Sequence, residues 1–457
     1  MMRAELGDKF VTDLRTLYTG RIPGGADLVT YWFEKARAEV AKFPLIRAGL
    51  LATQGIRGGS NRAVLMRIAD TARIFWAWSD RNWTLDGAAV HVSMIAFSGA
   101  PDDELMLDGI LVKNIFPNLR SDVEVTASSL LRENSGISFI GDQKGGKFEL
   151  SRSDADKLTR KLLNPNGRPN TDVIRPWVNG SDLTGRGRGL SIIDFGTDMS
   201  EQEAALYEAP FELVKKLVYP SRQENRREVR KQKWWLHHEP MPAMRMAVSN
   251  LSRFIVTPRV SKHRVFVWVP AKTLPDSAVV AVARDDDYFF GVLHSIIHET
   301  WARSQGTQVR EAESGFRYTP NSTFDTFPFP WPPGTEPSET EDPRVKAIAD
   351  AARQLVRLRD AWLNPLDTPE EELKKRTLTN LYNQRPTWLD NAHRILDEAV
   401  FAAYGWPTNL TTQQILANLL ALNHERAAAQ TSKDTPSKSK SSPKNSKTPK
   451  PKSTPVS

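Results

Sequence analysis

Apolar residues recur at helical spacing near the start of the chain. Within residues 27–42 they are Leu28, Trp32, Phe33, Ala36 and Val40. Residues three or four positions apart share one face of a helix, so this spacing predicts an amphipathic helix. A second helix is predicted over residues 62–71, with Ser60 or Asn61 as its N-terminal cap.

Short apolar runs between and after these helices predict strands. Residues 48–53 have the composition of a buried strand, and residues 73–78 and 88–97 are rich in aromatic and β-branched side chains. The turn-rich residues 79–87 separate the last two runs, which predicts a hairpin. We therefore expect part of an α/β unit in this region.

The pattern changes near residue 105. Strand-like segments then alternate with loops and short helices, which predicts a mixed α+β domain. A proline-dense segment at 327–333 closes this region, because such a segment continues neither a helix nor a central strand. The predicted strands are 107–112, 136–140, 254–257, 265–269 and 278–283.

Helical spacing returns after residue 343, with the clearest helices predicted at 345–362 and 389–404. The last residues are almost all Lys, Ser, Pro and Thr, a composition typical of disorder. The predicted fold class is therefore α/β plus α+β, followed by helices. The predicted boundaries are 1–104, 105–335 and 340–427, with a disordered basic tail at 428–457.

Composition narrows the classes of protein. The chain has no cysteine, which excludes disulfides, thiolate nucleophiles and cysteine-ligated zinc. No apolar run approaches the roughly 20 residues that span a bilayer, so we expect a cytoplasmic protein without a membrane partner. The net charge of +8 is concentrated at the end: residues 431–457 hold seven lysines and one aspartate, leaving 55 basic and 53 acidic side chains elsewhere. A nucleic-acid surface would have to be a local patch.

Several segments resemble one family when they are taken in this order and spacing. They are 24–36 (GGADLVTYWFEKA), 49–59 (GLLATQGIRGG), 74–80 (IFWAWSD), 85–93 (LDGAAVHVS), 316–330 (FRYTPNSTFDTFPFP) and 345–406. The first four are similar to the end of the catalytic domain in the MmeI-like branch of the gamma-class amino-methyltransferases. The last two resemble the end of that branch's target-recognition domain and its C-terminal helical domain.

The resemblance implies an adenine-specific DNA methyltransferase from a restriction-modification system. Such an enzyme uses S-adenosylmethionine to methylate N6 of an adenine that has been flipped out of double-stranded DNA. It further implies a partial Rossmann-like methyltransferase sheet in residues 1–104, a DNA-binding target-recognition domain in 105–335, and a helical domain in 340–427.

The chain departs from the family in two motifs. It contains neither the glycine-rich loop that holds the methyl donor nor the Asn-Pro-Pro-aromatic tetrapeptide that binds the flipped adenine. We therefore predict no catalytic residue in it, and expect a truncated or split product that is inactive alone. A separate chain carrying the N-terminal catalytic half is then an expected partner. The alternative is a non-catalytic DNA sequence-recognition subunit of a restriction-modification system.

Two short segments are candidates for the border of the target-base pocket. Gly25 and Asp27 stand in the segment that follows the catalytic motif in the family. Thr53 and Gln54 follow a predicted strand, where open α/β sheets place their ligands. The alternative for both segments is an ordinary loop that leads into a helix.

Two groups of residues are candidates for DNA contact. By resemblance, base-reading side chains cluster near the end of the recognition domain, and arginine and glutamate can read guanine and cytosine. This group is Arg310, Glu311, Glu313, Arg317 and Tyr318. The second group offers charges for phosphates and comprises Arg226, Arg230 and Lys233. Solvated charged faces, with a buried pair at Trp234 and Trp235, are the alternative.

One pair of histidines has metal-binding spacing. His294 and His298 stand four residues apart, but the His-Glu-x-x-His motif is absent and no third ligand is evident. We therefore predict no metal site and expect these side chains to pack in the core or to face DNA.

Overall fold

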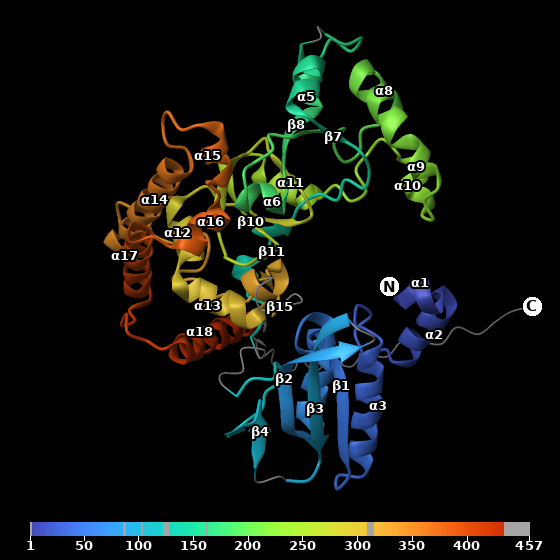
Figure 1. The fold of residues 1–457 in the computed structure, drawn as a ribbon, viewed down its shortest axis with the longest axis vertical. Coiled ribbons are helices and arrows are strands. Elements are labelled where there is room, and N and C mark those ends of the chain that lie inside the picture. Colours follow the sequence, from blue (N-terminus) through green and yellow to red (C-terminus); the bar gives the residue numbers. More distant parts are fainter. Residues whose placement is uncertain are drawn as a thin grey trace, which may run out of the picture.

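The computed structural model describes residues 2–85, 88–101, 104–121, 128–160, 163–308 and 315–433. Three hydrophobic cores organise these residues, the first within 18–119, the second within 148–281 and the third within 255–419. Figure 1 shows the sheet of the first core at one end of the molecule and the other elements beyond it.

The first core lies between two helices and a five-stranded sheet. The sheet order is β1-β3-β2-β4-β5. Its elements are α1 (Met2–Leu6), α2 (Asp8–Leu17), α3 (Val29–Lys42), β1 (Arg47–Thr53), the 3₁₀ turns η1 (Gln54–Arg57) and η2 (Gly59–Asn61), α4 (Arg62–Thr71), β2 (Arg73–Leu85), β3 (Ala88–Ser98), β4 (Leu105–Leu107) and β5 (Ile110–Val112). Helix α3 lies against β1 and α4 against β2, which confirms the predicted α/β character.

The Rossmann-like sheet implied by the resemblance is not confirmed. Three of the four pairings in this sheet are antiparallel, and only β2 and β4 run parallel. Within the described residues, β1 pairs with β3 alone and its other edge has no strand partner.

The second core is built from short elements around two four-stranded sheets. Their orders are β12-β10-β14-β6 and β13-β8-β9-β7. The elements are β6 (Ser138–Ile140), β7 (Glu149–Leu150), α5 (Arg152–Thr159), β8 (Ile174–Val178), α6 (Gly180–Thr184), β9 (Ser191–Ile193), α7 (Glu201–Ala205), α8 (Glu208–Leu217), α9 (Tyr219–Gln223), α10 (Glu228–Gln232), α11 (Pro242–Val248), β10 (Arg253–Pro258), β11 (Val260–Ser261), β12 (Val267–Pro270), β13 (Leu274–Pro275) and β14 (Val279–Val282).

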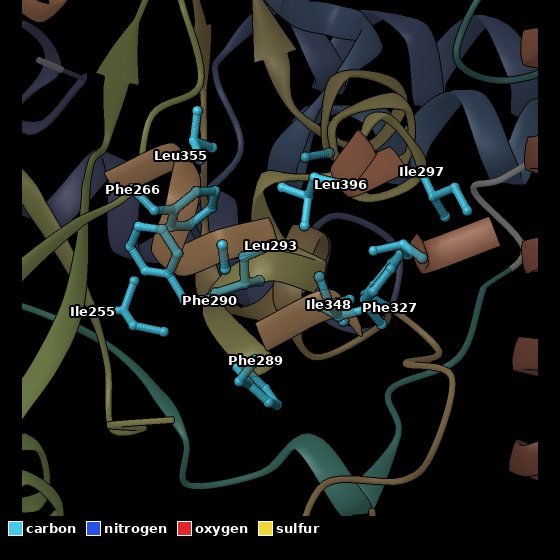
Figure 2. Packing of buried hydrophobic residues seen from close by; sticks show 14 of the residues in the cluster. Ile255, Phe266, Phe289, Phe290, Leu293, Ile297, Phe327, Ile348, Leu355 and Leu396 are labelled. Carbon is cyan, nitrogen blue, oxygen red and sulfur yellow. The ribbon is translucent and has the colours of Figure 1, made fainter. Parts of the chain in front are cut away.

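The third core joins the C-terminal helices to the end of the middle region. Its elements are α12 (Asp287–His294), α13 (Ile296–Gln305), β15 (Thr307–Gln308), β16 (Phe316–Arg317), the π-helical turn η7 (Pro320–Phe324), α14 (Pro343–Leu363), α15 (Glu370–Lys375), α16 (Leu378–Gln384), α17 (Thr387–Tyr404) and α18 (Thr412–Lys433). Helices α14 and α17 pack together and α12 packs on α14, with Phe289, Phe290, Ile348 and Leu396 buried between them (Figure 2).

The strands β10 and β14 connect the second and third cores. Successive side chains of a strand point to opposite faces. Ile255 and Val280 accordingly belong to the third core, whereas Val256 and Ala281 belong to the second. The sheet is thus buried on both faces, and the helical region is packed directly onto the strands of the middle region.

Helix α18 extends through Lys433, so it continues into the predicted tail at 428–457. Residues 434–457 lie outside the described part of the chain. No helix of the described residues is long and apolar enough to cross a membrane.

Candidate nucleic-acid interface

The loop before α3 and the turn after β1 are held together by one side chain. The Asn61 carboxamide oxygen accepts a hydrogen bond from the Asp27 backbone N–H at 2.7 Å, and its nitrogen donates to the Asp27 carboxylate at 2.7 Å. Gly25 faces Ser60 so closely that a Cβ on it would lie 3.1 Å from the Ser60 Oγ. The two candidate pocket segments are therefore neighbours in space.

Asn61 does not act as the predicted helix cap. Helix α4 begins at Arg62, as expected, but no side-chain cap bond forms at its N-terminus. The backbone of Asn61 is already helical, with φ −69° and ψ −37°, whereas a capping residue is usually extended. The carboxamide is used for the long-range contact with Asp27 instead.

The turn after β1 presents a fixed arginine. The Arg57 guanidinium donates to the side-chain oxygen of Gln54 at 3.2 Å and to the Asp80 carboxylate at 3.3 Å. The other Asp80 oxygen lies 2.7 Å from Nδ1 of His91. Burial lowers the pKa of Arg57, while the negative charge of Asp80 partly offsets that effect. Gln54 is buried and Thr53 is exposed, and whether either borders a base pocket stays a prediction.

This turn lines a pocket at the junction between the first core and the end of the middle region. Strand β15 lies against η1 here, close to the end of the sheet in Figure 1. The pocket has a volume of about 120 Å³. Four arginines from four separate segments line it, and they are Arg57, Arg62, Arg120 and Arg303. Sequence reasoning missed this cluster because its members are scattered over almost 250 positions.

The candidate residues at the end of the recognition region differ in whether the structure describes them and in their exposure. Arg310, Glu311 and Glu313 lie outside the described residues. Arg317 is exposed on β16 and lines an open cavity of about 660 Å³ together with Arg259. That position leaves the Arg317 side chain available for a polyanion.

The expectation for Tyr318 needs correction. Its side chain is 0% exposed in the third core, and its hydroxyl lies 3.0 Å from Nε2 of His298. Arg264 stacks over the Tyr318 ring at 5.0 Å. The ring packs in the interior because its neighbours are apolar and its hydroxyl has a buried partner, so it does not face DNA.

The second basic group is partly structural. Arg226 and Lys233 are exposed, but Arg230 is half-buried and pairs with Glu239 at 3.0 Å. Trp234 and Trp235 are buried, as the alternative interpretation held. Arg226 and Lys233 thus remain surface candidates for phosphates.

The paired histidines pack in the third core. His294 accepts a hydrogen bond from the Phe266 backbone N–H at 3.1 Å, and burial lowers its pKa well below the usual value. Burial lowers the pKa of His298 to about 3. The expectation of a packing role is confirmed for both side chains. Across the described ranges no group of three His, Asp or Glu residues is placed to hold a metal ion.

Comparisons with known proteins identify the fold. No protein-family model matches the chain, and no curated protein matches it. The solved structure of MmeI, a Type IIL restriction-modification enzyme in complex with DNA, matches with a TM-score of 0.71 and 22% sequence identity. The match covers 92% of this chain and 55% of that one, so the chain spans about half the length of MmeI.

A second similar structure is the type IIG restriction endonuclease BpuSI, with a TM-score of 0.26, 10% identity, and 79% of this chain and 47% of that chain covered. The chain thus has the mixed α/β fold of the corresponding part of a restriction-modification enzyme.

Proposed function

We propose that this chain is the DNA-recognition part of a site-specific adenine-N6 DNA methyltransferase in a restriction-modification system. The observation that carries the proposal is the fold, which matches that of MmeI over 92% of the chain; MmeI was solved in complex with DNA. The segments that resemble the MmeI-like branch run through the same part of the sequence.

The distribution of charge supports DNA as the ligand. Arg57, Arg120 and Arg303 line the pocket at the junction between the first core and the end of the middle region. Arg317 is exposed on strand β16. Positive groups of this kind contact phosphates and fix the position of a duplex. Other side chains would then read the base sequence. Among the described residues, Arg317 is the candidate for a base contact.

The basic pocket at the end of β1 does not fit the methyl donor. S-adenosylmethionine carries a sulfonium cation, and the pocket at the end of β1 is lined by four guanidinium groups. Like charges at close range repel. No step of methyl transfer is therefore assigned to the side chains of residues 1–457. The donor and the flipped adenine would be bound by a partner, either a separate chain or another part of the same enzyme, that carries the glycine-rich loop and the Asn-Pro-Pro-aromatic motif.

The open edge of β1 supports such a partner. Unpaired backbone groups on an edge strand form a template for a further strand. Apolar side chains are exposed beside this edge, with Leu51 44% exposed in β1 and Leu45 86% exposed just before it. We propose that the catalytic half adds to the sheet at this edge.

The test is reconstitution of methyl transfer. The pure chain, with tritiated S-adenosylmethionine and a mixture of duplexes, is expected to transfer no methyl groups. Addition of a chain that carries the glycine-rich loop and the Asn-Pro-Pro-aromatic motif of the same enzyme should give transfer to adenine. Turnover by the pure chain would contradict the division of labour proposed here.

A second candidate function is a recognition subunit that serves a separate enzyme without completing its active site. The pocket at the end of β1 favours it, because four arginines suit an anion and not a cationic methyl donor. Calorimetry separates the two: a donor-binding heat that appears only in the reconstituted complex supports the methyltransferase. DNA binding that persists with no donor binding in any mixture supports the recognition subunit.

A further inference from the structure

The basic pocket at the junction has the composition expected of an anion-binding site. Among the residues that the structure describes, its wall contains four arginines and no acidic residue. Arg57 and Arg62 come from the turn after β1 and the start of α4, Arg120 follows β5, and Arg303 lies on α13. Asp80 pairs with Arg57 and Glu299 with Arg303, but four guanidinium groups beside two carboxylates still leave the pocket positive, which favours a negative group.

Two of these arginines are held rigidly. Arg57 is oriented by Asp80 and Gln54, and Arg303 donates through Nε to the Glu299 carboxylate at 2.8 Å. The positive charge of Arg120 lowers the pKa of Arg57. An anion between the two guanidinium groups would relieve that repulsion.

An orphaned amide provides the second observation. Asn118 lines the same pocket and is only 6% exposed. Its side-chain oxygen accepts from the Arg120 backbone N–H at 3.1 Å, whereas its nitrogen has no hydrogen-bond partner among the described residues. Buried donors in native proteins are nearly always satisfied, so an unpaired one at the wall of a basic pocket points to a missing acceptor.

The backbone leaves room for a compact ligand. Gly58, Gly306 and Gly315 also line the pocket and place no side chain in it. A Cβ on Gly306 would lie 2.8 Å from the Ala302 carbonyl oxygen, and Gly315 has a positive φ of 82°, so larger residues are unsuited to both positions. The volume of about 120 Å³ suits a tetrahedral oxyanion with little else.

We propose that this pocket binds a single phosphate group of the DNA backbone, and that it locks the register between the sheet of the first core and the recognition region on the duplex. The proposal rests on the proposed function, since it specifies where DNA is held. Phosphate contacts carry no sequence information but supply affinity and orientation. One phosphate bound by arginines of the first core and of the recognition region would fix the relative position of these two parts when DNA is bound.

The experiment compares four proteins in binding a labelled random-sequence duplex over a range of salt concentrations. They are the wild type, Asn118→Asp, Arg120→Gln and the control Asn166→Asp. Asn166 is a matched control because its side-chain oxygen likewise accepts from the backbone N–H two residues later, at 3.0 Å, far from the pocket in sequence. Arg120 is exposed, so its replacement tests the pocket without disturbing a core.

The two pocket variants should bind roughly five- to tenfold more weakly near 0.1 M salt. For Arg120→Gln the negative slope of log affinity against log salt should become shallower by about one. The control should match the wild type in both respects. Equal affinity and slope for all four proteins would overturn the phosphate site while leaving the proposed function intact.

A second arm uses inorganic phosphate and needs no DNA. Because a ligand that binds only the folded state stabilises it, phosphate should raise the melting temperature of the wild type and of Asn166→Asp more than that of Asn118→Asp. If the wild type binds no DNA but shows this phosphate effect, the pocket is an anion site, while its assignment to a DNA phosphate and the proposed function both fail. An identical phosphate effect in all variants would exclude the site.

Discussion

Single side chains fix the geometry of the junction. Asn61 makes both a donor and an acceptor contact with Asp27, and Arg57 joins the turn after β1 to Asp80 on β2. Each contact spans more than twenty positions in the sequence. Their effect is to hold the loop before α3, the turn after β1 and the hairpin as one unit.

Replacement of Asn61 by alanine should destabilise the protein. The variant loses the two hydrogen bonds to Asp27 and a longer one to the Gly55 carbonyl, and it leaves the Asp27 N–H without its acceptor, which costs about 1–3 kcal/mol. Urea unfolding measures the change. Asn82→Ala is the control, because Asn82 is exposed on β2, and it should shift the unfolding free energy by under about 0.5 kcal/mol. Equal stability of both variants would contradict the role assigned to Asn61.

A buried carboxylate in the second core should make stability depend on acid. Burial alone would raise the pKa of Asp194, but the Arg245 guanidinium, at 2.7 and 3.0 Å, outweighs that effect and holds the pKa at about 2. Because the folded pKa lies below the ordinary aspartate value of 3.8, the stabilisation is present above about pH 4 and is lost as the pH falls through about 2.

The unfolding free energy of the wild type should therefore fall by about 2 kcal/mol more than that of Asp194→Asn between pH 5 and pH 2. Asp198→Asn, which removes an exposed carboxylate four residues away, is the control and should follow the wild type. Parallel curves for the wild type and Asp194→Asn would show that the ion pair with Arg245 has no such effect.

Individual roles were only partly predictable from the sequence. The start of α4 at Arg62 follows from local spacing, but the bond between Asn61 and Asp27 depends on tertiary contact and leaves no local pattern. Tyr318 stands beside exposed Arg317, yet it points into the third core. Tyr318 directly follows strand β16 (Phe316–Arg317), and side chains along extended backbone alternate between faces, so neighbours in sequence can have opposite environments.

Helices and strands follow the hydrophobic pattern where that pattern is long. The predicted helices at 345–362 and 389–404 correspond to α14 (Pro343–Leu363) and α17 (Thr387–Tyr404). The segment 79–85 was wrongly expected to be a turn, because its polar residues extend β2 in a hairpin that projects beyond the core. The predicted strand 107–112 is two strands, since Asp108 and Gly109 both have positive φ and form a tight turn.

Helix α17 provides a test of the packing between helices. Leu396 is 0% exposed in the third core, whereas the adjacent Ile395 is 49% exposed. Leu396→Ala should cost about 2–5 kcal/mol because it leaves a cavity in a close-packed interior. Ile395→Ala should cost far less, and chemical denaturation of the two variants measures the difference. Equal losses would mean that α17 does not pack as described.

The edge strand β1 has a matched test as well. Leu51→Lys places a charge on the open edge proposed for the catalytic half, whereas Ile110→Lys places one on β5 at the opposite edge of the same sheet. Both side chains are exposed, at 44% and 68%, so both variants should fold. Only Leu51→Lys should weaken reconstituted methyl transfer, by roughly tenfold or more. If only Ile110→Lys weakened methyl transfer, the catalytic half would have to pair with the β5 edge and not with the β1 edge.

At the scale of the whole molecule, the hydrophobic cores show how the middle region and the helical region are packed together. Strands β10 and β14 contribute alternate side chains to two cores, so the helical region and the middle region share one interior. The mixed α/β character of the chain, with helices and several short strands, was accessible from periodicity. The arginine pocket was not, because its residues meet only when Arg57 and Arg303 are brought together across the junction.

The central claim is that this chain reads a DNA sequence, and selection from a random pool tests it most directly. The pure chain is mixed with duplexes that carry a randomised central segment, and the bound molecules are recovered, amplified and sequenced over several rounds. We expect one short sequence to be enriched, with each changed base pair in it weakening binding by about 1–3 kcal/mol. Recovery of unenriched, random sequences after those rounds would contradict the account.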